Sequence, residues 1–187
     1  NLTVISRRWT GSTYLTMQEY FEAITAEMGR ASLAHVDAVN TIDLRRWYED
    51  VRELGYLATN TAAQERGVAI RRVFIVGSQD ADEVVLDCDE AQRDAGIEDV
   101  RYLAWDSISD LAEQPEDTVR FRTSSDGDDA GLLFVGHSDP IDVTRVAFGE
   151  RLLPGPELRR HGQLFELIRT ASDPDVHSFI AGRHSHG

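Results

Sequence analysis

The sequence predicts an α/β fold: a mixed, mostly parallel sheet flanked by helices, with two amphipathic helices in its N-terminal part. Two matching segments indicate the sheet. RGVAIRRVFIV, residues 66–76, and AGIEDVRYLAW, residues 95–105, each place a glycine before a β-branched apolar run. The acidic segment 80–95 between them is long enough for a crossover helix. A strand, a helix and a second strand in this order favour parallel pairing.

Helical periodicity before the first of these strands is the third observation. Thr16 and Glu19 have the spacing of a capping box, so a helix is expected to begin there. Its apolar stripe runs to about Val39 and comprises Tyr20, Phe21, Ile24, Met28, Ala31 and His35. A second stripe predicts another helix over residues 44–66, with Gly67 as its C-terminal stop.

The rest of the chain alternates between strand and helix patterns. The run 68–76 is nearly continuously apolar, as in a strand covered on both faces, and Gly96 is expected to end the helix after it. The remaining expected elements are a strand at 100–105, a helical turn at 107–113, an edge strand at 118–123, strands at 132–136 and 143–148, and a helix at 156–171. We predict one domain over residues 1–187: a helical part at 16–66, an α/β core at 67–171 and a tail at 172–187, of which residues 182–187 are expected to be frayed.

Composition narrows the classes of partner. The formal net charge of −14 disfavours attraction to phosphate backbones and anionic lipids, so the sequence predicts no nucleic acid and no membrane as partner. All 19 basic residues are arginine, which removes every mechanism that needs a lysine, including Schiff bases and phosphate-loop lysines. The single cysteine, Cys88, allows no internal disulfide and is flanked by carboxylates that raise a thiol pKa. We therefore predict a cytoplasmic protein without a catalytic thiolate.

The order of these elements resembles the phospholipase D-like superfamily. Ala63, Arg66, Gly67 and Val68 match the helix end of that family that leads into a central strand, and Phe134 to His137 falls where its catalytic turn lies. The resemblance covers residues 58–171. It implies a reaction centre with a His-x-Lys motif, yet Asp139 stands two positions after His137 and the chain has no lysine. The resemblance thus implies a catalytically degenerate relative of the sensor or regulatory type.

A ligand site is expected outside the carboxyl ends of the strands, as in other open α/β sheets. The residues at those ends are Ser78, Gln79, Trp105, Asp106, His137 and Asp139. Trp105 would supply an aromatic wall, His137 a switchable donor, and the aspartates acceptors for a polar or cationic group. No cofactor and no metal are predicted, because His137, Asp139 and Asp142 lie in a polar turn that explains them without a metal.

Arg71 and Arg72 stand out within the expected buried strand. One of them should pair with a carboxylate or face solvent, and one could hold an anionic ligand. Pairing is the favoured interpretation because carboxylates outnumber arginines.

Three functional classes fit these features. The favoured class is a non-catalytic regulatory or ligand-sensing domain that relays occupancy of its site through the N-terminal helices to a protein partner. The alternatives are a hydrolase that uses His137 with Asp139 or Asp142, and a structural interaction module. The first apolar stripe would serve as a core face or, alternatively, as a homodimer face formed by Tyr20, Phe21, Ile24 and Met28.

Overall fold

A computed structural model describes residues 12–41, 43–53, 55–108, 115–127, 130–138, 146–152 and 154–185. Its strands are β1 (Ser12–Thr16), β2 (Leu33–Asn40), β3 (Ala69–Val76), β4 (Asp99–Ala104), β5 (Asp117–Thr123), β6 (Leu132–Ser138) and β7 (Val146–Leu152). Its helices are α1 (Met17–Met28), α2 (Leu44–Glu53), α3 (Tyr56–Glu65), α4 (Asp82–Asp94), α5 (Pro156–Ala171) and α6 (Val176–His184), with a 3₁₀ turn, η1, at Trp105–Ser107.

The strands form one mixed sheet with the order β1-β7-β6-β5-β2-β3-β4. β2, β3 and β4 pair in parallel, whereas the other neighbours pair antiparallel. The predicted α/β class, with a mixed sheet flanked by helices, is confirmed. Parallel pairing is less extensive than predicted, because only two of the six pairings between described strands are parallel.

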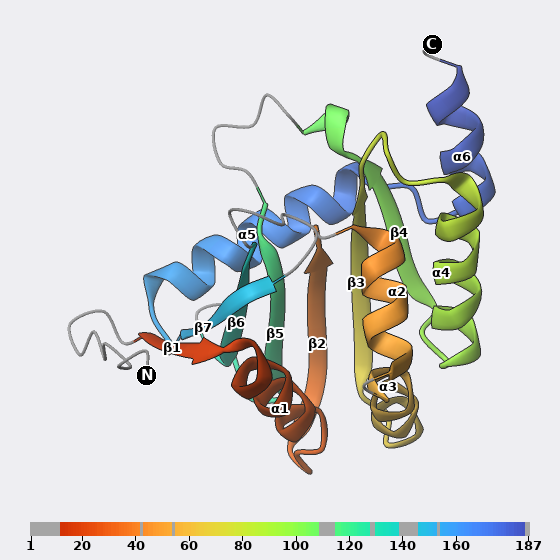
Figure 1. Cartoon of the computed structure of the whole chain (residues 1–187). Helices are drawn as coiled ribbons and strands as arrows, with labels where there is room; N and C mark the ends of the chain where they lie inside the picture. Colours follow the sequence, from red (N-terminus) through yellow and green to blue (C-terminus); the bar gives the residue numbers. More distant parts are fainter. Residues whose placement is uncertain are drawn as a thin grey trace.

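Strand direction decides which chain segments meet at each edge of the sheet. β6 runs in the same direction as β2, because β5 lies between them and is antiparallel to both. The carboxyl ends of β2, β3, β4 and β6 therefore share one edge with the amino end of β5 (Figure 1).

Helices cover both faces of the sheet. Figure 1 shows α1, α2, α3 and α4 on one face, while α5 crosses the other. The α1–α4 face holds the largest apolar cluster. In it the ring centroids of Trp47 and Phe74 lie 4.7 Å apart, and Phe74 stacks on Tyr102. On the α5 face, Phe165 and Ile168 pack against the apolar ends of the strands. Burial of each such side chain contributes roughly 1.5–3 kcal/mol to stability.

Local signals explain several element ends. The capping box is present: the Thr16 amide donates to Glu19 Oε2 at 2.8 Å, and Thr16 Oγ1 accepts from the Glu19 amide at 3.3 Å. Gly67 follows the end of α3 with a φ of 84°, as predicted for a helix stop. Gly55, with a φ of 67°, divides the predicted helix 44–66 into α2 and α3.

The expectation of a helix as far as Val39 is wrong. α1 ends at Met28, and residues 33–40 form β2, which pairs with β3 on one side and β5 on the other. Apolar residues in LAHVDAVN fit both periodicities, and burial between two neighbouring strands decides for the strand. The helical part predicted over residues 16–66 thus contains a central strand.

Two further expectations are corrected. The strand predicted at 118–123 is not at an edge, because β5 lies between β6 and β2. Residues 182–184, which were expected to be frayed, belong to α6, whose Val176 and Phe179 are buried in the main apolar cluster. Asp175 caps this helix by accepting from the Ser178 amide at 2.7 Å. The predicted turn at 107–113 lies mostly outside the described residues.

The first apolar stripe belongs to the core. Tyr20, Ile24 and Met28 are each at most 2% exposed, so their side chains are not available for a homodimer face.

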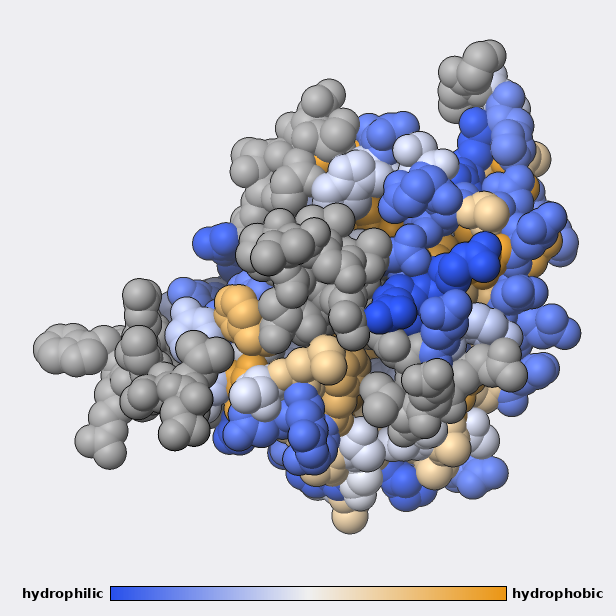
Figure 2. All heavy atoms as spheres, in the orientation of Figure 1, coloured by the Kyte–Doolittle hydropathy of each residue, from blue (hydrophilic) through white to orange (hydrophobic). Residues whose placement is uncertain are grey.

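The part of the outer surface formed by α4 and α6 is largely hydrophilic in Figure 2. Across the described ranges, no helix has both the length and the apolar composition needed to cross a membrane.

Candidate ligand-binding site at the carboxyl edge of the sheet

A cavity of about 490 Å³ opens at the edge where the carboxyl ends of β3, β4 and β6 meet the amino end of β5. We call it the acidic cavity, because the described residues that line it include five carboxylates and one histidine but no arginine. The carboxylates that line it are Asp43, Asp80, Asp106, Glu116 and Asp117. Its other polar and aromatic lining includes Ser78, Gln79, Trp105 and His137.

The residues predicted for the ligand site converge here. Ser78, Gln79, Trp105, Asp106 and His137 all line the acidic cavity, although they come from three separate strand ends. Asp139, the sixth predicted residue, lies outside the described residues, as does Asp142. The convergence follows from strand direction, since β3, β4 and β6 all end at this edge.

Asp80 shapes the floor of the cavity. Its carboxylate accepts from the Gly77 amide at 2.7 Å and from the Leu44 amide at 3.3 Å, so it ties the loop after β3 to the start of α2. Burial raises the pKa of Asp80. Arg183 of α6 also donates to the carbonyls of Gly77 and Asp80 at 3.0 Å each. Arg183, which lies in the stretch expected to be frayed, therefore helps to position the site.

Asp117 joins the cavity to the interior of the protein. It is 6% exposed and accepts from Asn40 Nδ2 at 3.2 Å and from the Thr41 amide at 3.3 Å. Burial raises the pKa of Asp117 to about 6. Burial, followed by the charge of Asp117, also raises the pKa of Tyr20 on α1. The charge on Asp117 thus acts on a residue of one of the N-terminal helices.

His137 is held between two carboxylates. Its Nδ1 lies 3.5 Å from Glu116 Oε1, its Nε2 lies 3.3 Å from Glu150 Oε2, and its ring stacks on Phe148 at 4.7 Å. The hydrogen bond to Glu116 and the contact with Glu150 raise the pKa of His137, against the effect of burial. A protonated imidazole donates hydrogen bonds but cannot act as nucleophile or general base.

Sequence reasoning missed Asp43, Asp80, Glu116 and Asp117. For Asp80 a signal existed, since it lies in the turn after a buried strand and aspartates favour turns by bonding to nearby backbone. Glu116 comes directly before β5 and Asp117 is its first residue, so their position at the cavity follows only from the antiparallel placement of that strand. Cys88 behaves as predicted: it is buried, and burial with the neighbouring Asp87 raises the pKa of its thiol to about 12.

The described residues contain no cluster of three or more side chains arranged to hold a metal ion.

No protein-family model matches the sequence, and no curated protein matches it. Among solved structures, the chain is similar to TrmBL2, which is described as an archaeal chromatin protein with a novel mode of DNA binding. The TM-score is 0.51 at 7% sequence identity, over 88% of this chain and 54% of the TrmBL2 chain. The chain thus spans about half the length of that protein, and the likeness is one of fold.

This likeness overturns one prediction from the sequence. We excluded nucleic acid as a partner because of the net charge of −14. TrmBL2 binds DNA and contains a region of this fold, so the exclusion was wrong. Net charge averages over a surface on which separate regions can carry opposite charges.

Proposed function

We propose that the chain is a non-catalytic ligand-sensing domain and that its ligand is a small organic cation bound in the acidic cavity. The observation that carries the proposal is the described lining itself: five carboxylates, one histidine and Trp105 around a cavity of about 490 Å³. That volume suits a metabolite-sized ligand. An ammonium or guanidinium group would gain both the carboxylates and a cation–π contact with Trp105.

The chemistry of the site favours binding over catalysis. A histidine nucleophile must be unprotonated, whereas Glu116 and Glu150 favour the protonated form of His137. No lysine is present to neutralise a substrate phosphate, and five carboxylates would repel one. The phospholipase D-like relationship stays a prediction, and within this proposal it describes a layout that has lost its reaction centre.

Asp117 offers a route for relaying occupancy. A bound cation would stabilise the ionised form of Asp117 and thereby change the electrostatic environment of Tyr20, a buried residue of α1. The N-terminal helices would then report the state of the cavity to whatever partner contacts them.

The test is a calorimetric titration with a panel of small cations, including a linear diamine, free arginine and a quaternary amine, with a neutral polyol for comparison. We expect at least one cation to bind. Trp105→Ala should lower the affinity for that cation by roughly tenfold. Leu167→Ala, at an exposed site on α5, is the matched control and should bind as the wild type does. Binding of the polyol alone would reject a cationic ligand, and unchanged affinity in Trp105→Ala would reject the site.

A further inference from the structure

A second cavity, of about 710 Å³, lies between the sheet and α5. We call it the arginine cavity. Its described lining residues are Arg71, Arg120, Arg122, Arg159, Asp37, Glu166, Gly162 and Gln163. Four guanidinium groups thus gather with two carboxylates among the described residues of this cavity, in a chain whose formal net charge is −14.

Strand register brings these side chains together. Asp37 on β2 lies opposite Arg71 on β3 and opposite Arg120 on β5, so the three form one row across the sheet. Arg122 is two residues beyond Arg120 and therefore projects from the same face. The helical residues of the lining, from Arg159 to Glu166, follow the three-and-four spacing that places them on one side of α5.

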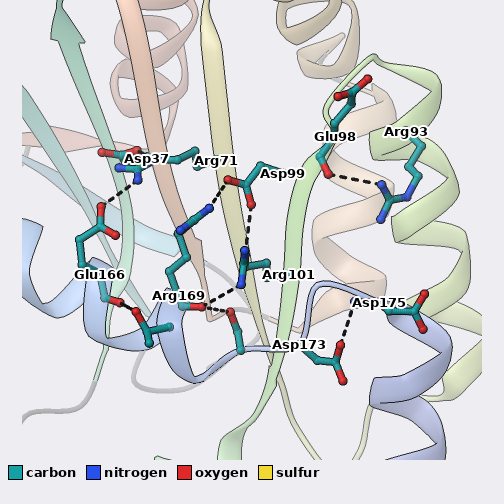
Figure 3. A network of polar contacts seen from close by, with 12 residues as sticks. Asp37, Arg71, Arg93, Glu98, Asp99, Arg101, Glu166, Arg169, Asp173 and Asp175 are labelled. Carbon is teal, nitrogen blue, oxygen red and sulfur yellow. Dashed lines mark hydrogen bonds and ion pairs between the residues drawn. The ribbon is translucent and has the colours of Figure 1, made fainter.

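Hydrogen bonds hold the arginines in fixed positions. Asp37 accepts from Arg71 Nε at 2.6 Å and from Arg122 Nη2 at 3.0 Å, so a single carboxylate serves two guanidinium groups. Figure 3 shows Glu166 of α5 reaching the same Arg71, and this ion pair measures 2.8 Å. Arg120 is 5% exposed and donates to the carbonyl of Ala130 at 2.9 Å. Such orientation in advance of binding lowers the entropy lost on binding.

A buried donor of the cavity lacks an acceptor among the described residues. The Nε of Arg122 is buried and makes no hydrogen bond to any described residue, although a buried guanidinium nitrogen normally has a partner. The cavity still opens to solvent, since the side chains of Arg71 and Glu166 are 25% and 53% exposed. A ligand can therefore reach the arginines.

We propose that the arginine cavity is a binding site for a small phosphate-bearing molecule, separate from the acidic cavity. Guanidinium groups match the geometry of phosphate oxygens and bind them through paired hydrogen bonds. Four guanidinium groups suit an anionic ligand, and the volume lies within the range of small-molecule sites. Residues of α5 line one side of the cavity, which favours a small ligand over duplex DNA.

The test uses inorganic phosphate and a sugar monophosphate as probes, at constant ionic strength set with chloride, followed by calorimetry and thermal unfolding. We expect both probes to raise the melting temperature above the chloride reference. Arg122→Gln should weaken binding by roughly tenfold to a hundredfold, as expected for the loss of a charge-assisted contact. Arg122→Lys should bind at an intermediate level, because it keeps the charge but not the paired donors.

Arg93→Gln is the matched control: this arginine is 44% exposed, pairs with Asp89 on α4, and lies outside the cavity, so binding should not change. If Arg122→Gln fails to fold, the exposed Arg159→Gln on α5 replaces it, with the same expected direction. Equal stabilisation by phosphate and chloride, or wild-type affinity in both cavity variants, would overturn the proposal. A third outcome would overturn the proposal in favour of a nucleic-acid surface: the wild type binds duplex DNA but not phosphate, and Arg122→Gln no longer binds the DNA.

Discussion

The acidic cavity and the arginine cavity occupy different parts of one sheet. Each contains a buried aspartate, and the two aspartates have hydrogen-bond donors of different charge. Asp37 is 4% exposed and Asp117 is 6% exposed. Asp37 bonds to two guanidinium groups, whereas Asp117 accepts from two neutral donors, the Asn40 amide and the Thr41 backbone. The two aspartates are thus buried to a similar extent, but charged donors surround Asp37, whereas neutral donors surround Asp117, whose pKa burial raises to about 6.

The largest effect should come from Asp37→Asn, which removes a carboxylate shared by Arg71 and Arg122. Arg71 would keep its ion pair with Glu166, whereas Arg122 would lose the charge of Asp37 and lie beside a second guanidinium group. Since breaking a buried ion pair from one side is costly, we expect the free energy of unfolding to fall by roughly 2–4 kcal/mol. Urea unfolding at low salt measures this loss.

The same variant sharpens the proposal for the arginine cavity. Phosphate should raise the melting temperature of Asp37→Asn by more than it raises that of the wild type, because the anion replaces the lost negative charge. A loss of stability that phosphate does not reduce relative to chloride would argue that the cavity is a structural ion network only.

Asp117→Asn should have the opposite sign at neutral pH. The pKa of an aspartate is ~3.9 in an unfolded chain, and burial raises that of Asp117 to about 6 in the folded protein. The folded state then holds an extra proton between these values, so this contribution to stability is complete below pH 4 and is lost as pH rises past 6. The neutral variant should gain roughly 2–3 kcal/mol over the wild type between pH 4 and pH 7.

Denaturant unfolding of both proteins across that pH range is the measurement. The informative quantity is the change in their difference with pH, because any fixed cost of altering the hydrogen bonds cancels. A difference that is flat from pH 4 to pH 7 would show that Asp117 is not the buried, destabilised carboxylate described here.

The smallest effect is expected for His137→Gln. The pKa of this histidine is raised in the folded state by Glu116 first and by Glu150. Its contribution is therefore present below the unfolded value of ~6.5 and is lost as pH rises through the folded value. The side chain is 25% exposed, so we expect less than about 1 kcal/mol. Proton NMR of the imidazole, compared with unfolding at pH 6 and pH 8, checks both the direction and the size.

The acidic cavity could be predicted in part, whereas the arginine cavity could not. Ser78, Trp105 and His137 each follow an apolar strand pattern, and the rule for open sheets then places them at one edge. The pairing of Arg71 with a carboxylate was expected, but its partners, Asp37 and Glu166, depend on the register of β2 and on where α5 crosses the sheet. Register is a tertiary property that no local pattern in this sequence states.

The fold shows the same division between local and tertiary information. The capping box and the bounds of α5 are local features, and the prediction of a helix at 156–171 is confirmed. β2 was taken for the end of a helix because short apolar runs are ambiguous, and pairing on both sides resolves the ambiguity in the folded protein. The error at β2 also hid Asp37, since a helix would have placed it elsewhere.

One crossed experiment tests the central claim, that two cavities of opposite charge bind different ligands. The wild type, Trp105→Ala and Arg122→Gln would each be titrated calorimetrically with the best-binding cation of the panel and with phosphate. We predict that Trp105→Ala loses affinity for the cation and keeps that for phosphate, while Arg122→Gln does the reverse. The existence of two independent sites would be contradicted if either variant lost affinity for both ligands. It would also be contradicted if both variants kept wild-type affinity for both ligands.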